Sequence, residues 1–222
     1  METKETQNPQ LEQNLGGHEA ADVLSRIKAN KKLITGAAVA VVVVIIAALA
    51  WYFINQANSR KADEAAGRAD IEQNDSIALQ LYKEAATYGH ASGNRAKLEV
   101  AMRLYEKADY QGALEYLEDA SIDDHIVAAG ALTLKGDCLV NLEKYDEALS
   151  AYDKAISKAD KNPAIVPLIL IKKANIFHEQ KNYTDEAAAY KTILDEYAQY
   201  NAGTQFDVRK AYSRANALAQ NK

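Results

Sequence analysis

Two patterns of hydrophobic and polar residues divide the chain. Residues 33–54 form a run of 22 residues without a charged side chain. Beyond this run, small, aromatic and aliphatic residues recur at the three- and four-residue intervals that place them on one face of a helix. Only three prolines occur, and Gly/Pro clusters are absent from the long stretches rich in Ala, Leu, Lys, Glu and Tyr. The sequence therefore predicts an all-α protein.

The uncharged run predicts a transmembrane helix at residues 33–54, because an apolar helix needs about 20 residues to cross a bilayer. Trp51, Tyr52 and Phe53 stand near its end, where aromatic side chains favour the headgroup region. Basic residues are denser before the run than after it: Arg26, Lys28, Lys31 and Lys32 against Arg60 and Lys61. This bias predicts a polar cytoplasmic tail at residues 1–32 and a domain at 55–222 outside the cytoplasm.

The sequence disfavours two other interpretations of the run. A cleaved signal peptide fits the small residues up to Ala50, but the preceding tail is long and the apolar run continues past Ala50. A buried core helix is disfavoured by the length of the uncharged run. Within the tail, residues 20–29 fit a short amphipathic helix that rests on the membrane surface or extends the span.

A repeat follows the run. Tyr110 and Tyr145 are 35 residues apart, and each is followed by alanine three positions later. The equivalent positions in a degenerate earlier copy and in a later copy are Asp75 and Tyr183. A period near 34 is typical of stacked helix-turn-helix units. Small residues such as Gly136 let two helices approach, and large ones such as Tyr152 fill the space between units, so stacking supplies the stability.

These positions resemble the tetratricopeptide repeat family. The resemblance implies a helical solenoid at residues 55–203, with about three to four helix-turn-helix units near 59–90, 94–125, 129–162 and 167–198. The unit at 167–198 is expected to carry about one extra residue in its turn. Residues 204–222 are predicted to form a C-terminal capping helix that packs through Phe206, Tyr212 and Leu218.

Charge and motifs argue against nucleic-acid binding, metal binding and catalysis. The net charge of -5 falls on the part after the span, because residues 1–32 are neutral, and a mildly acidic domain has no electrostatic reason to bind nucleic acid. The tyrosines occupy repeat packing positions and are not expected to stack bases. The four histidines lack metal-ligand spacing, and Cys138 lies mid-helix as a small buried hydrophobe would. We expect no enzyme activity, cofactor, metal or small-molecule substrate.

Protein binding is the remaining function. First helices of such repeats line a concave surface, and mixed apolar and amide groups there suit an extended peptide or a partner helix. The register places eight side chains on this surface: Leu98, Met102, Tyr105, Asp137, Asn141, Ile171, Asn175 and His178.

The order of segments along the chain indicates which kind of membrane protein to expect. A short cytoplasmic tail, one span, an Ala-rich linking helix and about three repeats resemble the YfgM-type ancillary subunit of the bacterial SecYEG translocon. The resemblance implies a single-pass inner-membrane protein with a periplasmic repeat domain. Its implied partners are SecYEG and a membrane-anchored periplasmic chaperone, and its implied role is to assist secreted proteins. An envelope-assembly or cell-division scaffold and a regulatory subunit of a membrane-bound enzyme are the two alternatives.

Overall fold

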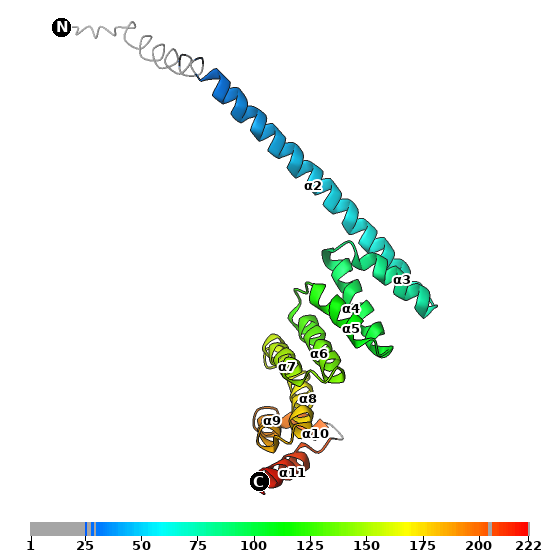
Figure 1. Cartoon of the computed structure of the whole chain (residues 1–222), viewed down its shortest axis with the longest axis vertical. Coiled ribbons are helices and arrows are strands. Elements are labelled where there is room, and N and C mark those ends of the chain that lie inside the picture. The colour runs from blue at the N-terminus through cyan, green and yellow to red at the C-terminus, as the bar shows by residue number, and fades with distance from the viewer. Residues whose placement is uncertain (1–24, 26–27, 29, 204–205, 222) are drawn as a thin grey trace, which may run out of the picture. The chain divides into compact units, whose positions relative to one another are not determined.

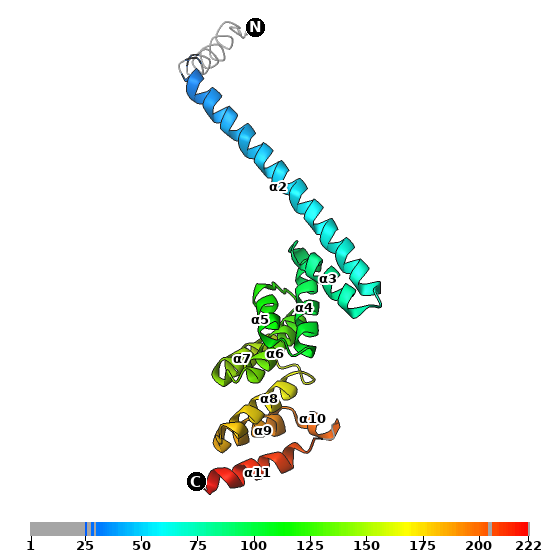
Figure 2. The same cartoon turned by 45° about the vertical axis from the view of Figure 1, so that its right-hand side comes forward.

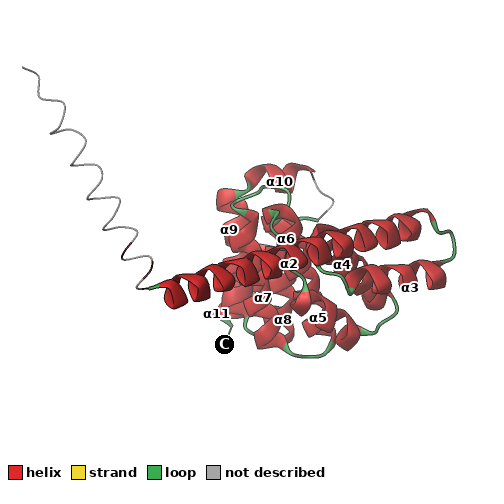
Figure 3. Ribbon diagram, turned by 90° about the horizontal axis from the view of Figure 1, so that it is seen from above, coloured by secondary structure: helices red, strands yellow, loops and turns green. Residues whose placement is uncertain are grey.

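The described part of the chain consists of helices joined by short connections. The computed structural model describes residues 25, 28, 30–203 and 206–221, and no strand occurs among them (Figures 1 and 3). The helices are α2 (Lys31–Ile71), α3 (Asp75–Ala86), α4 (His90–Glu106), α5 (Tyr110–Asp119), α6 (His125–Asn141), α7 (Tyr145–Ala159), α8 (Val166–Glu179), α9 (Tyr183–Glu196), α10 (Ala198–Gly203) and α11 (Val208–Gln220). The prediction of an all-α fold is confirmed.

The chain divides into two compact units, one ending at Gln56 and the other beginning at Ala57. Helix α2 contributes to both, because its 41 residues run through this boundary. By length and composition α2 can cross a membrane, since about 20 apolar residues suffice. Its large apolar side chains at 39–54 are each more than half exposed. The predicted tail and the amphipathic helix at 20–29 lie outside the described residues, apart from a few positions between 25 and 32.

In the second unit, helices follow one another in chain order and each packs against its neighbours, as Figure 2 shows. The second helices α3, α5, α7 and α9 begin at Asp75, Tyr110, Tyr145 and Tyr183, the four positions that the repeat pattern made equivalent. The partners of these helices are the last part of α2, then α4, α6 and α8. Helix α11 packs on α9 after the short α10, and so closes the array as the predicted capping helix.

Three turns within the helix pairs have the same conformation. Ala108, Glu143 and Lys181 each adopt a left-handed backbone, with φ near 60°. The next amide N–H donates to a carbonyl five residues earlier, at 2.9, 2.8 and 2.8 Å: Asp109 to Leu104, Lys144 to Leu139 and Asn182 to Phe177. This six-to-one bond satisfies a carbonyl that the helix end would leave unpaired. The extra residue expected in the turn of the last unit is therefore wrong, because three residues separate the two helices in this turn, as in the other two.

Small side chains bring paired helices close together. Gly136 of α6 lies against the ring of Tyr152 of α7, and a Cβ at residue 136 would overlap that ring. Ala148 and Ala155 of α7 are fully buried, and Tyr152 is 2% exposed. Because neither helix can bury this face alone, the buried residues form clusters that extend across neighbouring pairs, one from α2 to α8 and a second around α8, α9 and α11.

The capping helix covers the last pair with a narrow apolar stripe. Val208 and Ala215 are fully buried, and Tyr212 packs against the same cluster. Phe206 precedes the helix and contacts the ring of Tyr190 at a centroid distance of 6.0 Å. Asp207 caps the helix by accepting a hydrogen bond from the Lys210 amide at 3.0 Å.

Candidate protein-binding surface

The eight predicted side chains lie on three first helices, α4, α6 and α8, and differ in how available they are. Met102 is 40% exposed, and Asn141 and Asn175 are also exposed. Leu98 and Tyr105 are partly buried and pack against the core. Ile171 is partly buried beside the C-terminal cluster. The remaining two, Asp137 and His178, are engaged with neighbouring helices.

Asp137 joins three helices. Its carboxylate accepts a hydrogen bond from the Tyr152 hydroxyl at 2.6 Å and pairs with the ammonium of Lys172, on α8, at 2.9 Å. Asn141 donates to the Asp137 main-chain carbonyl at 2.8 Å. Burial, together with the bond to Asp137, raises the pKa of Tyr152, so its hydroxyl stays a donor. Asp137 therefore holds α6, α7 and α8 together, and its carboxylate already has two partners.

A similar arrangement joins the first helices, and the sequence reasoning missed it. Asp70, near the end of α2, accepts a hydrogen bond from the Tyr82 hydroxyl at 2.5 Å and pairs with Arg95 of α4 through both of its oxygens, at 3.1 and 2.8 Å. Arg103 lies over the Tyr82 ring, 4.5 Å from its centroid. The hydrogen bonds from Arg95 and Tyr82 lower the pKa of Asp70. One signal in the sequence could have identified this arrangement. Tyr82 occupies the position equivalent to Tyr152, and Asp70 lies near the end of the preceding helix.

His178 is tied to a buried carboxylate. Its Nδ1 lies 2.8 Å from Oε2 of Glu186 on α9, and Arg214 of α11 lies 3.6 Å from Oε1. Glu186 is fully buried, although it occupies the position that alanine fills in the three other pairs. The carboxylate thus links α8, α9 and the capping helix. His178 contributes to this junction as well as to the surface.

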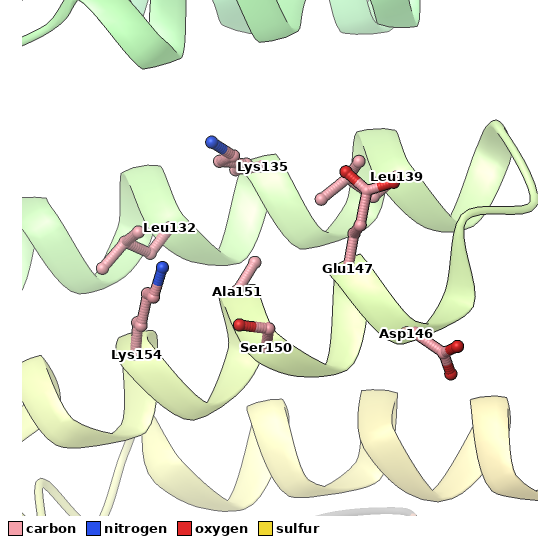
Figure 4. A pocket seen from close by; sticks show the side chains of 8 residues that line it. All are labelled: Leu132, Lys135, Leu139, Asp146, Glu147, Ser150, Ala151 and Lys154. Carbon is pink, nitrogen blue, oxygen red and sulfur yellow. The ribbon is translucent and has the colours of Figure 1, made fainter.

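Two clefts add surface that the register did not identify. One lies between α6 and α7 and has a volume of about 380 Å³. Figure 4 shows its apolar floor of Leu132, Leu139 and Ala151 between charged side chains from both helices. Lys135, at its edge, pairs with Glu118 of α5 at 2.9 Å. None of the eight predicted residues lines this cleft.

The other cleft, the α4–α6 cleft, has a volume of about 470 Å³. It lies at the N-terminal ends of α4 and α6 and is closed by the loop at 120–124. Leu98, one of the eight predicted residues, contributes to its wall. The amide N–H of Ser121 donates to Asn94 Oδ1 at 3.1 Å, which fixes the loop against α4. The volume falls within the range of ligand-binding pockets in proteins.

The single cysteine is not available for chemistry in the folded chain. Cys138 is fully buried, as expected, and burial beside Asp137 raises the pKa of its thiol to about 11. A protonated thiol is a poor nucleophile and a poor metal ligand. Within the described ranges, no group of three His, Cys, Asp or Glu residues is placed to hold a metal ion.

Comparison with known proteins agrees with this geometry. A family model described as tetratricopeptide repeat matches residues 98–163, which extend from within α4 through α7. No curated protein matches the chain. The match supports the tetratricopeptide resemblance for the central helix pairs. Since this repeat is a non-catalytic protein-interaction repeat, binding to other proteins is the function that the fold and the comparison indicate.

Proposed function

We propose that the chain is a membrane-anchored scaffold that binds proteins at the bacterial inner membrane. Residues 33–54 form its single span, the N-terminal tail is cytoplasmic, and the repeat domain is periplasmic. The observation that carries this proposal is α2, which joins an apolar segment long enough to span a bilayer to the first helix of the repeat domain. A domain built from such repeats and attached in this way recruits partners to a membrane surface.

The proposed role is that of an ancillary subunit of the Sec translocon, or of a chaperone adaptor for secreted proteins. Its proposed partners are SecYEG and a membrane-anchored periplasmic chaperone. The layout supports this choice. The basic residues before the span favour a repeat domain in the periplasm, and secreted chains emerge from the translocon into the periplasm. The first-helix surface, with the exposed Met102 and Asn175 and the partly buried Tyr105 as contacts, is the proposed partner-binding site.

Crosslinking in intact membranes followed by mass spectrometry tests partner and topology together. We expect crosslinks from residues 55–222 to SecY and to a periplasmic chaperone. Crosslinks from this domain to cytoplasmic proteins would overturn the orientation. Recovery of division or wall-synthesis proteins in place of SecY would favour an envelope-assembly scaffold, and recovery of one membrane enzyme would favour a regulatory subunit.

The surface assignment has its own control. Replacement of Met102, Tyr105 and Asn175 together by alanine should remove the crosslinked partners. Replacement of three exposed second-helix residues, Gln111, Ser157 and Thr184, should leave them in place. Equal recovery from both variants would show that partners bind elsewhere.

A further inference from the structure

The α4–α6 cleft has an apolar wall that opens to solvent. Leu98 and Ile122 are partly buried, and Val127 is 43% exposed although it is a large hydrophobic residue. The adjacent Ile126 is 46% exposed. Two neighbouring aliphatic side chains at this level of exposure form a site where burial by a partner is favourable, at about 25 cal/mol for each Å² covered.

The rim of this cleft carries excess negative charge. Asp123 is exposed and has no ion pair or hydrogen bond with any described residue. Asp124, the next residue along the chain, caps α6 by accepting hydrogen bonds from the Ile126 and Val127 amides, both at 2.9 Å. The one cation of the lining, Arg95, is neutralised by Asp70. A basic group on the partner is therefore complementary to the rim.

The first turn of α4 borders the cleft. Helix α4 begins after Gly89 without a side-chain cap, so amide N–H groups of its first turn lack the partner that a capping side chain supplies. His90 and Ala91, in that turn, line the cleft. A polypeptide offers carbonyl oxygens to such donors, whereas a hydrocarbon chain offers none.

We propose that the α4–α6 cleft binds an apolar side chain of a partner polypeptide that carries lysine or arginine two positions away. In an extended peptide, side chains two positions apart point to the same side. One therefore enters between Leu98, Ile122 and Val127 while the other pairs with Asp123. This assignment rests on the proposed protein-binding function and specifies which segment of a partner the domain selects.

Fluorescence anisotropy with the full chain in lipid nanodiscs tests the proposal. Three labelled probes have a Gly/Ser background and differ at their centre, which reads Leu-Ser-Lys, Leu-Ser-Glu or Ser-Ser-Lys. We expect Leu-Ser-Lys to bind most tightly. Val127→Ser should weaken its binding about tenfold, since burial of one aliphatic side chain is lost. Asp123→Lys should weaken it about fivefold and make Leu-Ser-Glu the preferred probe.

Matched controls separate recognition from general disturbance. Leu168→Ser and Glu179→Lys, both on α8, also change exposed residues but do not line this cleft, and they should leave all three affinities unchanged. Equal binding of the three probes, or an Asp123→Lys variant that still prefers lysine, would refute the proposal. So would a lack of peptide binding combined with a change of oligomeric state in Val127→Ser, which would assign the cleft to a second copy of the chain. If the probes fail while membrane crosslinking still recovers protein partners, the cleft assignment falls and the scaffold function stands.

Discussion

Gly136 and Gly130 lie on the same helix, yet only Gly136 faces a side chain from another helix at close range. The ring of Tyr152 fills the space that a Cβ at residue 136 would need, whereas nothing lies within 4 Å of a Cβ built at residue 130. The absence of a side chain at residue 136 is thus a packing requirement. At residue 130 no packing contact requires glycine, and glycine there only lowers the helix propensity.

Gly136→Ala should therefore destabilise the domain by about 1–3 kcal/mol, since added volume in a filled core displaces its neighbours. Gly130→Ala should stabilise it by about 0.5–1 kcal/mol. Urea unfolding of the full chain, followed by circular dichroism, measures both changes. Equal effects of the two substitutions would contradict the close approach of α6 and α7.

Asp70 makes the stability of the domain depend on pH in the acid range. Because Arg95 and Tyr82 lower its pKa in the folded protein, the contribution of Asp70 to stability is complete above the ordinary pKa of an aspartate. It is lost as the pH falls through the lowered value. Asp70→Asn should lower the free energy of unfolding by about 0.5–1 kcal/mol at pH 7 and by nearly nothing at pH 2. The value at pH 7 is modest because the side chains of Asp70 and Arg95 are each two-fifths exposed or more. Arg95→Gln should reduce the same acid-dependent part. Parallel pH curves for the native chain and Asp70→Asn would exclude this role.

Cys138 should resist alkylation in the folded chain. It is fully buried, and its pKa of about 11 leaves little thiolate at pH 8. We expect no adduct with iodoacetamide at pH 8 by intact-mass measurement and complete reaction in 6 M guanidinium. Rapid modification without denaturant would show that α6 opens in the native state.

At the residue scale, the sequence predicted packing better than pairing. Gly136, Tyr152 and Cys138 were recognised because the repeat register alone decides which positions face inward. The partners of Asp70, Asp137 and Glu186 were missed, because an ion pair between helices depends on how far one helix is shifted against the next. That shift leaves no periodic mark on the sequence.

The helix pair is the element that recurs, and three of the four pairs share one turn conformation. Ala108, Glu143 and Lys181 hold a left-handed conformation that costs a residue with a Cβ about 1–2 kcal/mol. None of the three is glycine, so the six-to-one hydrogen bonds and the packing of both helices maintain this backbone. The helix starts were predictable, since each follows the turn at a fixed distance. The turn conformation was not, because these residues are not those that favour it.

Ala108→Gly should stabilise the domain by about 0.5–1 kcal/mol, the relief of backbone strain less the greater freedom of glycine in the unfolded chain. The same replacement at Ala188, which is exposed within α9, should destabilise it by about 1 kcal/mol. Denaturant midpoints of the two variants supply the comparison. A loss of stability in both would show that residue 108 does not depend on the left-handed backbone.

At the scale of the whole molecule, the helix pairs form an array in which each pair is supported by its neighbours. Such arrays lose stability locally when one interface is weakened. Val208 is fully buried between α11 and the last pair, whereas Ala217 of the same helix is exposed. The capping helix therefore stabilises the last pair, and weakening its contacts should destabilise α9 and α8 first.

Val208→Ser should increase amide hydrogen exchange in α9 and α8, while exchange in α4 and α5 changes little. Ala217→Ser is the control and should leave the exchange pattern of the native chain intact. Uniform acceleration across the second unit would show that the domain opens as one cooperative body and not pair by pair.

The proposed topology is testable on the same chain. In a Cys138→Ser background, a cysteine at Gln73, exposed between α2 and α3, should react with a membrane-impermeant maleimide in spheroplasts. A cysteine at Asn30 should react only after permeabilisation. The opposite labelling pattern would reverse the orientation of the span.

The buried Glu186 limits how this array can have grown. Its carboxylate meets His178 within the last pair and Arg214 in the capping helix, so α9 and α11 match each other specifically. An additional pair inserted after α9 would leave a fully buried carboxylate without its arginine, and a buried charge that loses its partner is strongly destabilising. Lengthening by duplication is therefore expected upstream of α8, where each second helix carries alanine at the corresponding position. We therefore expect the final pair and its cap to behave as one terminal module.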